Sequence, residues 1–122
     1  MISHIARVCL LALVSVAAVP AASSARTPYD GAWSVLIVTQ RGSCDRAYRY
    51  GIQIVDGNLM YQGGVVNLTG RVNTSGAVRV SVSAGDARAN GSGRLTRSSG
   101  RGSWSGRSGG DACSGYWEAE RR

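Results

Sequence analysis

The sequence predicts an all-β domain, and three features of residues 26–122 indicate it. Apolar and polar residues alternate with a period of two along most of this region, as expected for strands that bury one face. Short turns rich in Gly, Asn and Asp separate the alternating segments. No window of the region has the 3.6-residue period of an amphipathic helix. We therefore expect an antiparallel meander of about eight short strands, forming either a small barrel or a two-sheet sandwich.

The expected strands follow one another closely along the chain. The first is rich in β-branched and aromatic residues. The second and third are joined by Asp56-Gly57, the strongest short hairpin signal. Gly63-Gly64 interrupts the pattern before the fourth strand, and the fifth alternates very regularly. In order, the strands cover residues 31–40, 48–55, 58–61, 66–72, 78–83 and 87–95, then a segment around Trp104 and a last one with Cys113 and Trp117.

The positions of two cysteines test the strand count. Cys44 lies just past the end of the first expected strand, and Cys113 lies at the start of the last. A disulfide needs their Cα atoms within about 7 Å of each other. In an up-and-down meander these two points meet only if the number of strands is even. Eight strands satisfy this condition, whereas a bulge at Gly63-Gly64 within one long strand would leave seven, so we favour eight.

Residues 1–25 are expected to be a cleaved signal peptide. A short basic start is followed by a twelve-residue apolar run, Val8 to Val19, and by small residues that favour cleavage after Ala25. The run is shorter than the roughly 20 residues that a membrane-spanning helix needs. We therefore expect one domain over residues 26–122, exported to the periplasm or the cell exterior, with no transmembrane segment.

Removal of this segment limits the chemistry of the domain. The remaining chain would have 97 residues (122 − 25), with 13 Arg against 7 acidic residues, a net charge of +6. It would contain no His, because His4 is the only one, and two cysteines, Cys44 and Cys113. Two thiols in an exported protein predict one disulfide. Without His, Ser-His-Asp and Cys-His catalysis is impossible and a zinc site is disfavoured. We therefore expect no enzyme, no catalytic residues and no metal site.

Arginines follow the outward positions of successive strands. Such a face would attract acidic polysaccharide or anionic lipid, whereas export disfavours nucleic acid as a partner. The alternative interpretation is a solvated face that discourages edge pairing between molecules. The residues expected to contact a partner are Arg71, Arg79, Arg88, Arg94, Arg101 and Arg107.

Several motifs are spread over nearly all of residues 26–122. They are residues 29–35 (YDGAWSV), 42–44 (GSC), 48–49 (YR), 91–95 (GSGRL), 102–106 (GSWSG) and 113–121 (CSGYWEAER). Together they resemble a family of small exported alphaproteobacterial proteins that are often labelled exoproteins of haem utilisation or adhesion. The resemblance supports pairing of Cys44 with Cys113 and implies a role in haem use or adhesion. It carries over no catalytic or binding residues.

The sequence thus predicts an exported, glycine-rich, non-enzymatic binding or surface-interaction module. Its partner would be anionic or a glycan, held by the arginine-rich face. The alternative function is haem binding or transfer through a tyrosine, since a Tyr can ligate haem iron. Apart from haem, no cofactor is expected. Tyr48 and Tyr50 alternate with polar residues and are expected to point inward, so they are also candidates for the packed core.

Overall fold

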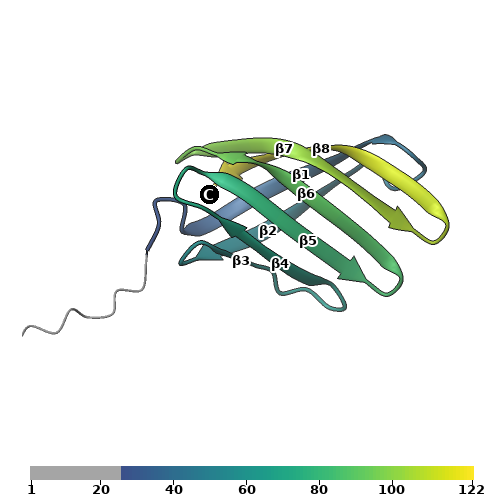
Figure 1. Ribbon diagram of the computed structural model, residues 1–122, viewed down its shortest axis with the longest axis horizontal. Helices are drawn as coiled ribbons and strands as arrows, with labels where there is room; N and C mark the ends of the chain where they lie inside the picture. Colours follow the sequence, from purple (N-terminus) through teal and green to yellow (C-terminus); the bar gives the residue numbers. More distant parts are fainter. Residues whose placement is uncertain (1–25) are drawn as a thin grey trace, which may run out of the picture.

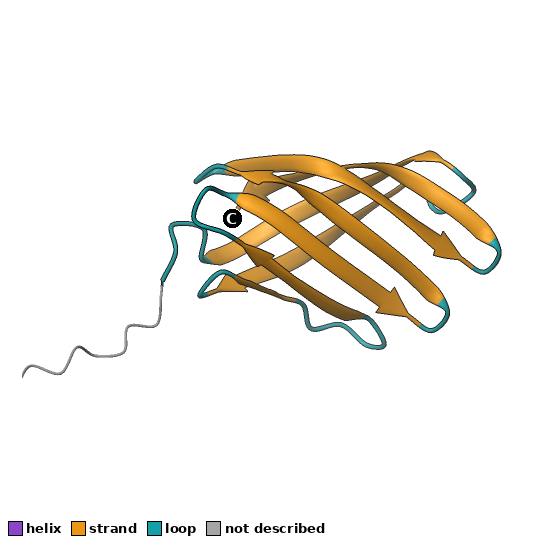
Figure 2. Ribbon diagram, in the orientation of Figure 1, coloured by secondary structure: helices purple, strands orange, loops and turns teal. Residues whose placement is uncertain are grey.

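The structure is a computed structural model that describes residues 26–122, and the expected signal peptide lies outside the described residues. Eight antiparallel strands close into a barrel in which each strand pairs with the next and the last pairs with the first (Figure 1 and Figure 2). No helix in the described region is long and apolar enough to cross a membrane. The strands are β1 (Gly31–Arg41), β2 (Ala47–Val55), β3 (Asn58–Met60), β4 (Asn67–Val72), β5 (Ala77–Ala84), β6 (Ala87–Leu95), β7 (Ser99–Ser108) and β8 (Asp111–Arg121).

The closed barrel confirms the antiparallel meander and decides between the barrel and the sandwich. Residues 61–66 form the loop between β3 and β4, so Gly63 and Gly64 lie between two strands and not in a bulge within one. The even strand count places β8 beside β1, where Cys44 and Cys113 form a disulfide with their Cα atoms 6.2 Å apart. The inference from the cysteine positions is therefore confirmed.

One end of the barrel, which we call the packed end, is filled by side chains. Trp33 is 1% exposed and lies among these side chains. The guanidinium of Arg121 lies 4.7 Å from the centre of a Trp33 ring, a cation–π contact. The same guanidinium donates hydrogen bonds to the carbonyls of Pro28 (2.6 Å) and Asp30 (2.7 Å). The buried cluster around Trp33 contains Tyr29, Ile54, Val72, Val78, Leu95, Trp117 and Ala119.

Asp30 fastens the segment before β1 to the turn between β2 and β3. Its carboxylate accepts hydrogen bonds from the backbone N–H groups of Asp56 (2.8 Å) and Gly57 (3.1 Å) and from the hydroxyl of Thr27 (2.6 Å). Burial raises the pKa of Asp30, but these hydrogen bonds together outweigh burial, and the pKa lies below its ordinary value of 3.8. The attachment holds Tyr29 in the buried cluster.

Trp117 shows how the packed end fits bulky rings into a narrow barrel. It lies opposite Gly102 of β7, and its indole N–H reaches past this strand to the carbonyl of Ser92 on β6 (3.2 Å). A Cβ at Gly102 would clash with the Ser92 carbonyl oxygen and lie 2.6 Å from the Trp117 ring. The glycine is therefore required for the indole to lie flat across the strand.

Candidate functional site

The interior of the barrel contains a cavity of about 580 Å³. Its floor is the packed end, where Trp33 and Trp117 line it, and all eight strands contribute to its wall. Its mouth lies at the other end, among the β1–β2 and β3–β4 loops and the β5–β6 and β7–β8 turns. We call this the open end. The volume falls within the roughly 300–1,000 Å³ that is typical of small-molecule sites.

Small residues on β6 explain why the interior is not filled. Ala87, Ala89 and Gly91 point inward and line the cavity, so no bulky side chain from β6 fills this part of the interior. Nearer the packed end Gly93 also points inward, but the Trp117 ring occupies the space beside it. An eight-stranded barrel is just wide enough either to be filled by side chains or to hold one small ligand. The packed end follows the first arrangement and the open end follows the second.

The cavity wall offers contact surface and few hydrogen-bonding groups. The indole N–H of Trp33 donates to the carbonyl of Tyr29 (2.8 Å), and that of Trp104 donates to the carbonyl of Val38 (3.1 Å). The indole N–H of Trp117 is also hydrogen-bonded to a backbone carbonyl. Within residues 26–122, every buried side-chain nitrogen or oxygen has a hydrogen-bond partner. Polar groups on a ligand would lose hydrogen bonds to water here without replacing them, so the wall favours an apolar ligand.

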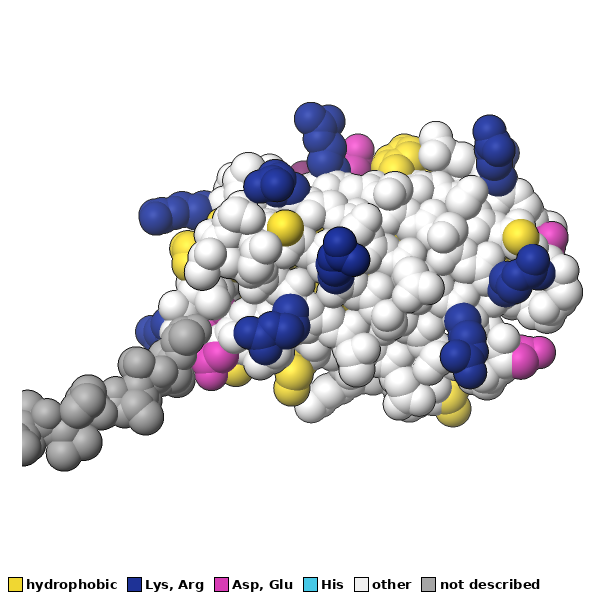
Figure 3. Space-filling model, viewed as in Figure 1, with side chains coloured by type: hydrophobic (Ala, Val, Ile, Leu, Met, Phe, Trp, Pro, Cys, Tyr) yellow, Lys and Arg dark blue, Asp and Glu magenta, His cyan; other side chains and the backbone are white. Residues whose placement is uncertain are grey.

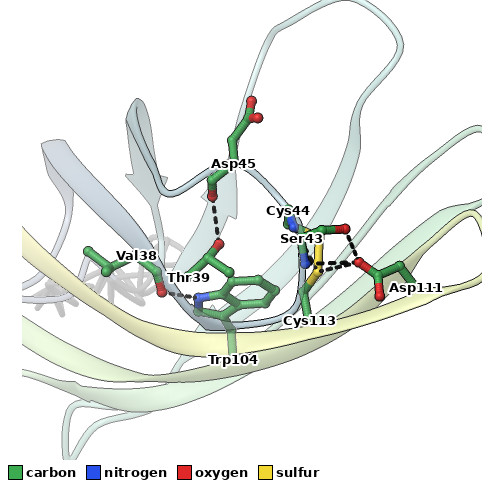
Figure 4. The surroundings of a disulfide bond; sticks show 8 residues. All are labelled: Val38, Thr39, Ser43, Cys44, Asp45, Trp104, Asp111 and Cys113. Carbon is green, nitrogen blue, oxygen red and sulfur yellow. Dashed lines mark hydrogen bonds between the residues drawn. A yellow bond between two sulfur atoms is a disulfide. The ribbon is translucent and has the colours of Figure 1, made fainter.

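The disulfide holds the β1–β2 loop at the mouth (Figure 4). Beside it, the backbone N–H and the hydroxyl of Ser43 both donate to the Asp111 carboxylate, the former at 2.9 Å. These hydrogen bonds lower the pKa of Asp111. The carboxylate also lies close to the sulfur atoms of Cys44 and Cys113. Both sulfurs are used in the disulfide, so they offer no thiolate to a metal ion.

Three tyrosines stand at the mouth of the cavity. Tyr48, Tyr50 and Tyr61 line it, and their rings contact one another with centroids 5.8 Å and 5.6 Å apart. The inward direction of Tyr48 and Tyr50 agrees with the sequence, but their assignment to the packed core is wrong, since Tyr48 is 37% exposed and Tyr50 is only half-buried. The sequence alternation is identical for a filled and a hollow interior, so it could not tell the two apart.

The six arginines expected to bind a partner lie on the outer surface of β4 to β7 and form three pairs. Each pair consists of residues directly opposite each other on neighbouring antiparallel strands. Figure 3 shows basic side chains spread over the visible face, with acidic side chains mainly near its edges. Like charges directly opposite each other destabilise a sheet. The pairs are Arg71 with Arg79, Arg88 with Arg107, and Arg94 with Arg101.

The arginine pairs flank a polar strip. The strip is a shallow outer hollow in which hydroxyl and amide side chains alternate with inward-pointing residues. Within the strip, the Ser81 hydroxyl donates a hydrogen bond to the Asn90 side-chain oxygen (2.9 Å). Arg71 and Arg79 lie at its edge. The polar residues of the strip are Thr69, Ser81, Asn90, Ser92, Ser103 and Ser105.

One pair lies apart from the other two. Arg88 and Arg107 line the mouth of the cavity, whereas Arg71, Arg79, Arg94 and Arg101 lie outside its lining. All six side chains therefore lie on the outer surface, and two of them also border the mouth of the cavity. Sequence reasoning missed the cavity. The one signal that the sequence offers for it is the run of Ala and Gly at the inward positions of β6.

Comparison with known proteins adds no functional assignment: no family model, curated protein or solved structure matches this chain. The functional argument therefore depends on the geometry of the barrel itself.

Proposed function

We propose that this chain is an exported, non-enzymatic binding protein that holds a small apolar ligand inside its barrel. The observation that carries the proposal is the apolar cavity of about 580 Å³, which opens at one end of the barrel. The disulfide supports export, because such bonds persist mainly in oxidising compartments.

Two features of the wall indicate that the cavity is a binding site and not simply a poorly packed core. An empty cavity is destabilising because the atoms around it lose their packing contacts. Here the hollow part is bounded by a tightly packed floor at Trp33 and by a disulfide at the mouth. The barrel therefore keeps its shape around the space, and a ligand that filled it would restore the missing contacts.

The test is titration of the oxidised protein, residues 26–122, with diphenylhexatriene, a neutral apolar dye that fluoresces when it leaves water. We expect saturable binding with one site per chain. Ala89→Phe would fill part of the cavity and should weaken binding by about tenfold or more, since overpacking costs roughly 1–3 kcal/mol. Ser92→Phe adds the same ring on the outer surface of the same strand, at a position outside the cavity lining, and serves as the control. Equal dye affinity in both variants would place the dye outside the barrel.

Haem ligation through the phenolate of Tyr48 or Tyr50 is opposed by the raised pKa of both groups. A tyrosine that binds haem iron does so as a phenolate. The hydrogen bond from Tyr48 to the Asp45 carboxylate, together with burial, raises the pKa of Tyr48 to about 12. Burial and the neighbouring Tyr61 and Asp45 also raise the pKa of Tyr50. The phenolate is thus disfavoured where an iron ligand would be needed. Haemin belongs in the titration as a competitor, and a Soret shift abolished by Tyr50→Phe would contradict this interpretation.

A second candidate function is attachment of the outer face to an acidic polysaccharide. The observation that favours it is the set of three directly opposed arginine pairs, an arrangement that is unfavourable between like charges even though Arg101 also lies opposite Glu118 on β8. A polyanion that lay across the polar strip would relieve this repulsion. The test is salt-dependent binding to dextran sulfate. Replacement of Arg79 and Arg94 by Glu should abolish it, and unchanged binding would exclude this function while leaving the cavity proposal intact.

A further inference from the structure

Arg88 and Arg107 define a charged rim on an apolar cavity. They lie directly opposite each other on β6 and β7, each next to an inward-pointing residue that lines the wall. Among the described residues, neither guanidinium donates a hydrogen bond to another side chain or carbonyl. In each of the other two pairs one guanidinium has such a partner, since Arg71 donates to Asn58 and Arg94 donates to the carbonyl of Ser75, whereas Arg79 and Arg101 donate no bond of this kind within residues 26–122.

Of the three carboxylates at this end of the barrel, Asp86 of the β5–β6 turn is exposed to solvent, and the other two interact with neighbouring side chains. Asp45 lines the cavity beside the Tyr48 phenol and raises its pKa. Asp111 accepts both hydrogen bonds of Ser43 in the loop attachment. The carboxylates of Asp45 and Asp111 therefore take part in the structure of the mouth. The guanidinium groups of Arg88 and Arg107 have their N–H donors available for a ligand.

We infer that the ligand is an anionic amphiphile, with its apolar body inside the barrel and its acidic head group at Arg88 and Arg107. This inference rests on the proposed function and names the chemical class of its ligand. A guanidinium donates in a planar fork that matches a carboxylate or a phosphate. Two of them side by side also repel each other, and an anion between them removes this repulsion. A neutral ligand of the same shape would leave the pair uncompensated.

The experiment measures displacement of diphenylhexatriene by three ligands with the same twelve-carbon chain: dodecanol, dodecanoate and dodecyl phosphate. The alcohol is neutral, and the other two distinguish a free acid from a phosphate head group. At neutral pH and low salt, both anions should displace the dye at a concentration about tenfold lower than the alcohol, as expected for charge-assisted hydrogen bonds. Because the rim is exposed, added salt should reduce this preference.

The variant Arg88→Gln with Arg107→Gln should bring the anions to the level of dodecanol and leave the dye and the alcohol unchanged. Retained dye binding also shows that the variant is folded. Arg97→Gln with Arg122→Gln removes the same charge at the packed end and is the matched control.

The outcomes separate the two proposals. Failure of the wild-type protein to bind the dye would overturn the cavity function and this inference together. Dye binding with no preference for the anions would overturn this inference alone, as would a preference that survives in the rim variant or is lost equally in the control.

Discussion

Trp104 reaches past β8 to donate its indole N–H to the carbonyl of Val38 on β1, with 3.1 Å between nitrogen and oxygen. The residue opposite Trp104 on β8 is Gly115, and a Cβ there would clash with the same carbonyl. The register of β1 and β8 shifts just beyond Val38, between Thr39 and Arg41. Trp104 thus completes the hydrogen bonding of the wall at the point where the strand pairing changes.

This arrangement predicts that Gly115→Ala is destabilising although it adds a single methyl group. The substitution should cost about 1–3 kcal/mol or more, because the added atom must displace either the Val38 carbonyl or the strand itself. Urea unfolding of the oxidised protein measures the change. Gly51→Ala, within β2 at a position where the added Cβ would meet no close atom and φ is not positive, is the comparison without a clash. An equal effect in both variants would show that the clash is not the cause.

The disulfide between Cys44 and Cys113 should contribute a large share of the stability. It closes a loop with a sequence separation of 69, for which the chain-entropy model predicts about 4 kcal/mol. Reduction, or replacement of both cysteines by serine, should therefore lower the midpoint of thermal unfolding by tens of degrees, at roughly 4–8 °C for each kcal/mol. The reduced protein should also bind diphenylhexatriene more weakly, since the β1–β2 loop forms part of the mouth. Unchanged thermal stability would show that hydrogen bonds such as Ser43 to Asp111 suffice to hold the loop.

The strand order and the disulfide could be predicted because they depend on local patterns. Alternation identifies which residues of a strand share a face, and the hairpin turns identify neighbouring strands. The even strand count then brings Cys44 close to Cys113. None of these steps requires knowledge of how far the strands lie from the barrel axis.

The cavity and the arginine pairs could not be predicted because they depend on register and volume. Alternation places Arg88 and Arg107 on the outside, but only the pairing of β6 with β7 makes them direct neighbours. That pairing is set by the short turn at residues 96–98, where Thr96 bonds to Ser99. The inward residues Ala89 and Gly91 are equally compatible with a bulky partner across the barrel, as Gly93 shows with Trp117.

Acid should weaken the packed end through Asp30. Its pKa is lowered in the folded protein, so the stabilisation is present above the unfolded pKa and is lost as the pH falls through the folded value, below about pH 4. Asp30→Asn should therefore lose less stability than the wild type between neutral pH and pH about 2. Thr27→Val removes the hydroxyl donor and brings the pKa of Asp30 closer to its ordinary value, so the loss of stability in acid should become smaller. Urea unfolding at several pH values measures both effects. Parallel stability curves for the wild type and Asp30→Asn would refute the assignment.

A single substitution can reveal whether the outer arginines are kept for binding. Arg79 lies opposite Arg71, so Arg79→Glu replaces repulsion by attraction and should stabilise the barrel by about 0.2–1 kcal/mol. The same substitution should weaken salt-dependent binding of dextran sulfate, because it reverses a charge beside the polar strip. Arg79→Gln removes the repulsion without adding attraction and should give intermediate results in both measurements. A protein that becomes more stable while it loses a ligand is the expected behaviour of a functional surface that costs stability. If Arg79→Glu stabilises the barrel and leaves dextran sulfate binding unchanged, the pair has no role in holding a polyanion. The pair of Arg94 and Arg101 and the rim pair of Arg88 and Arg107 would then be the remaining candidate anion sites on this face.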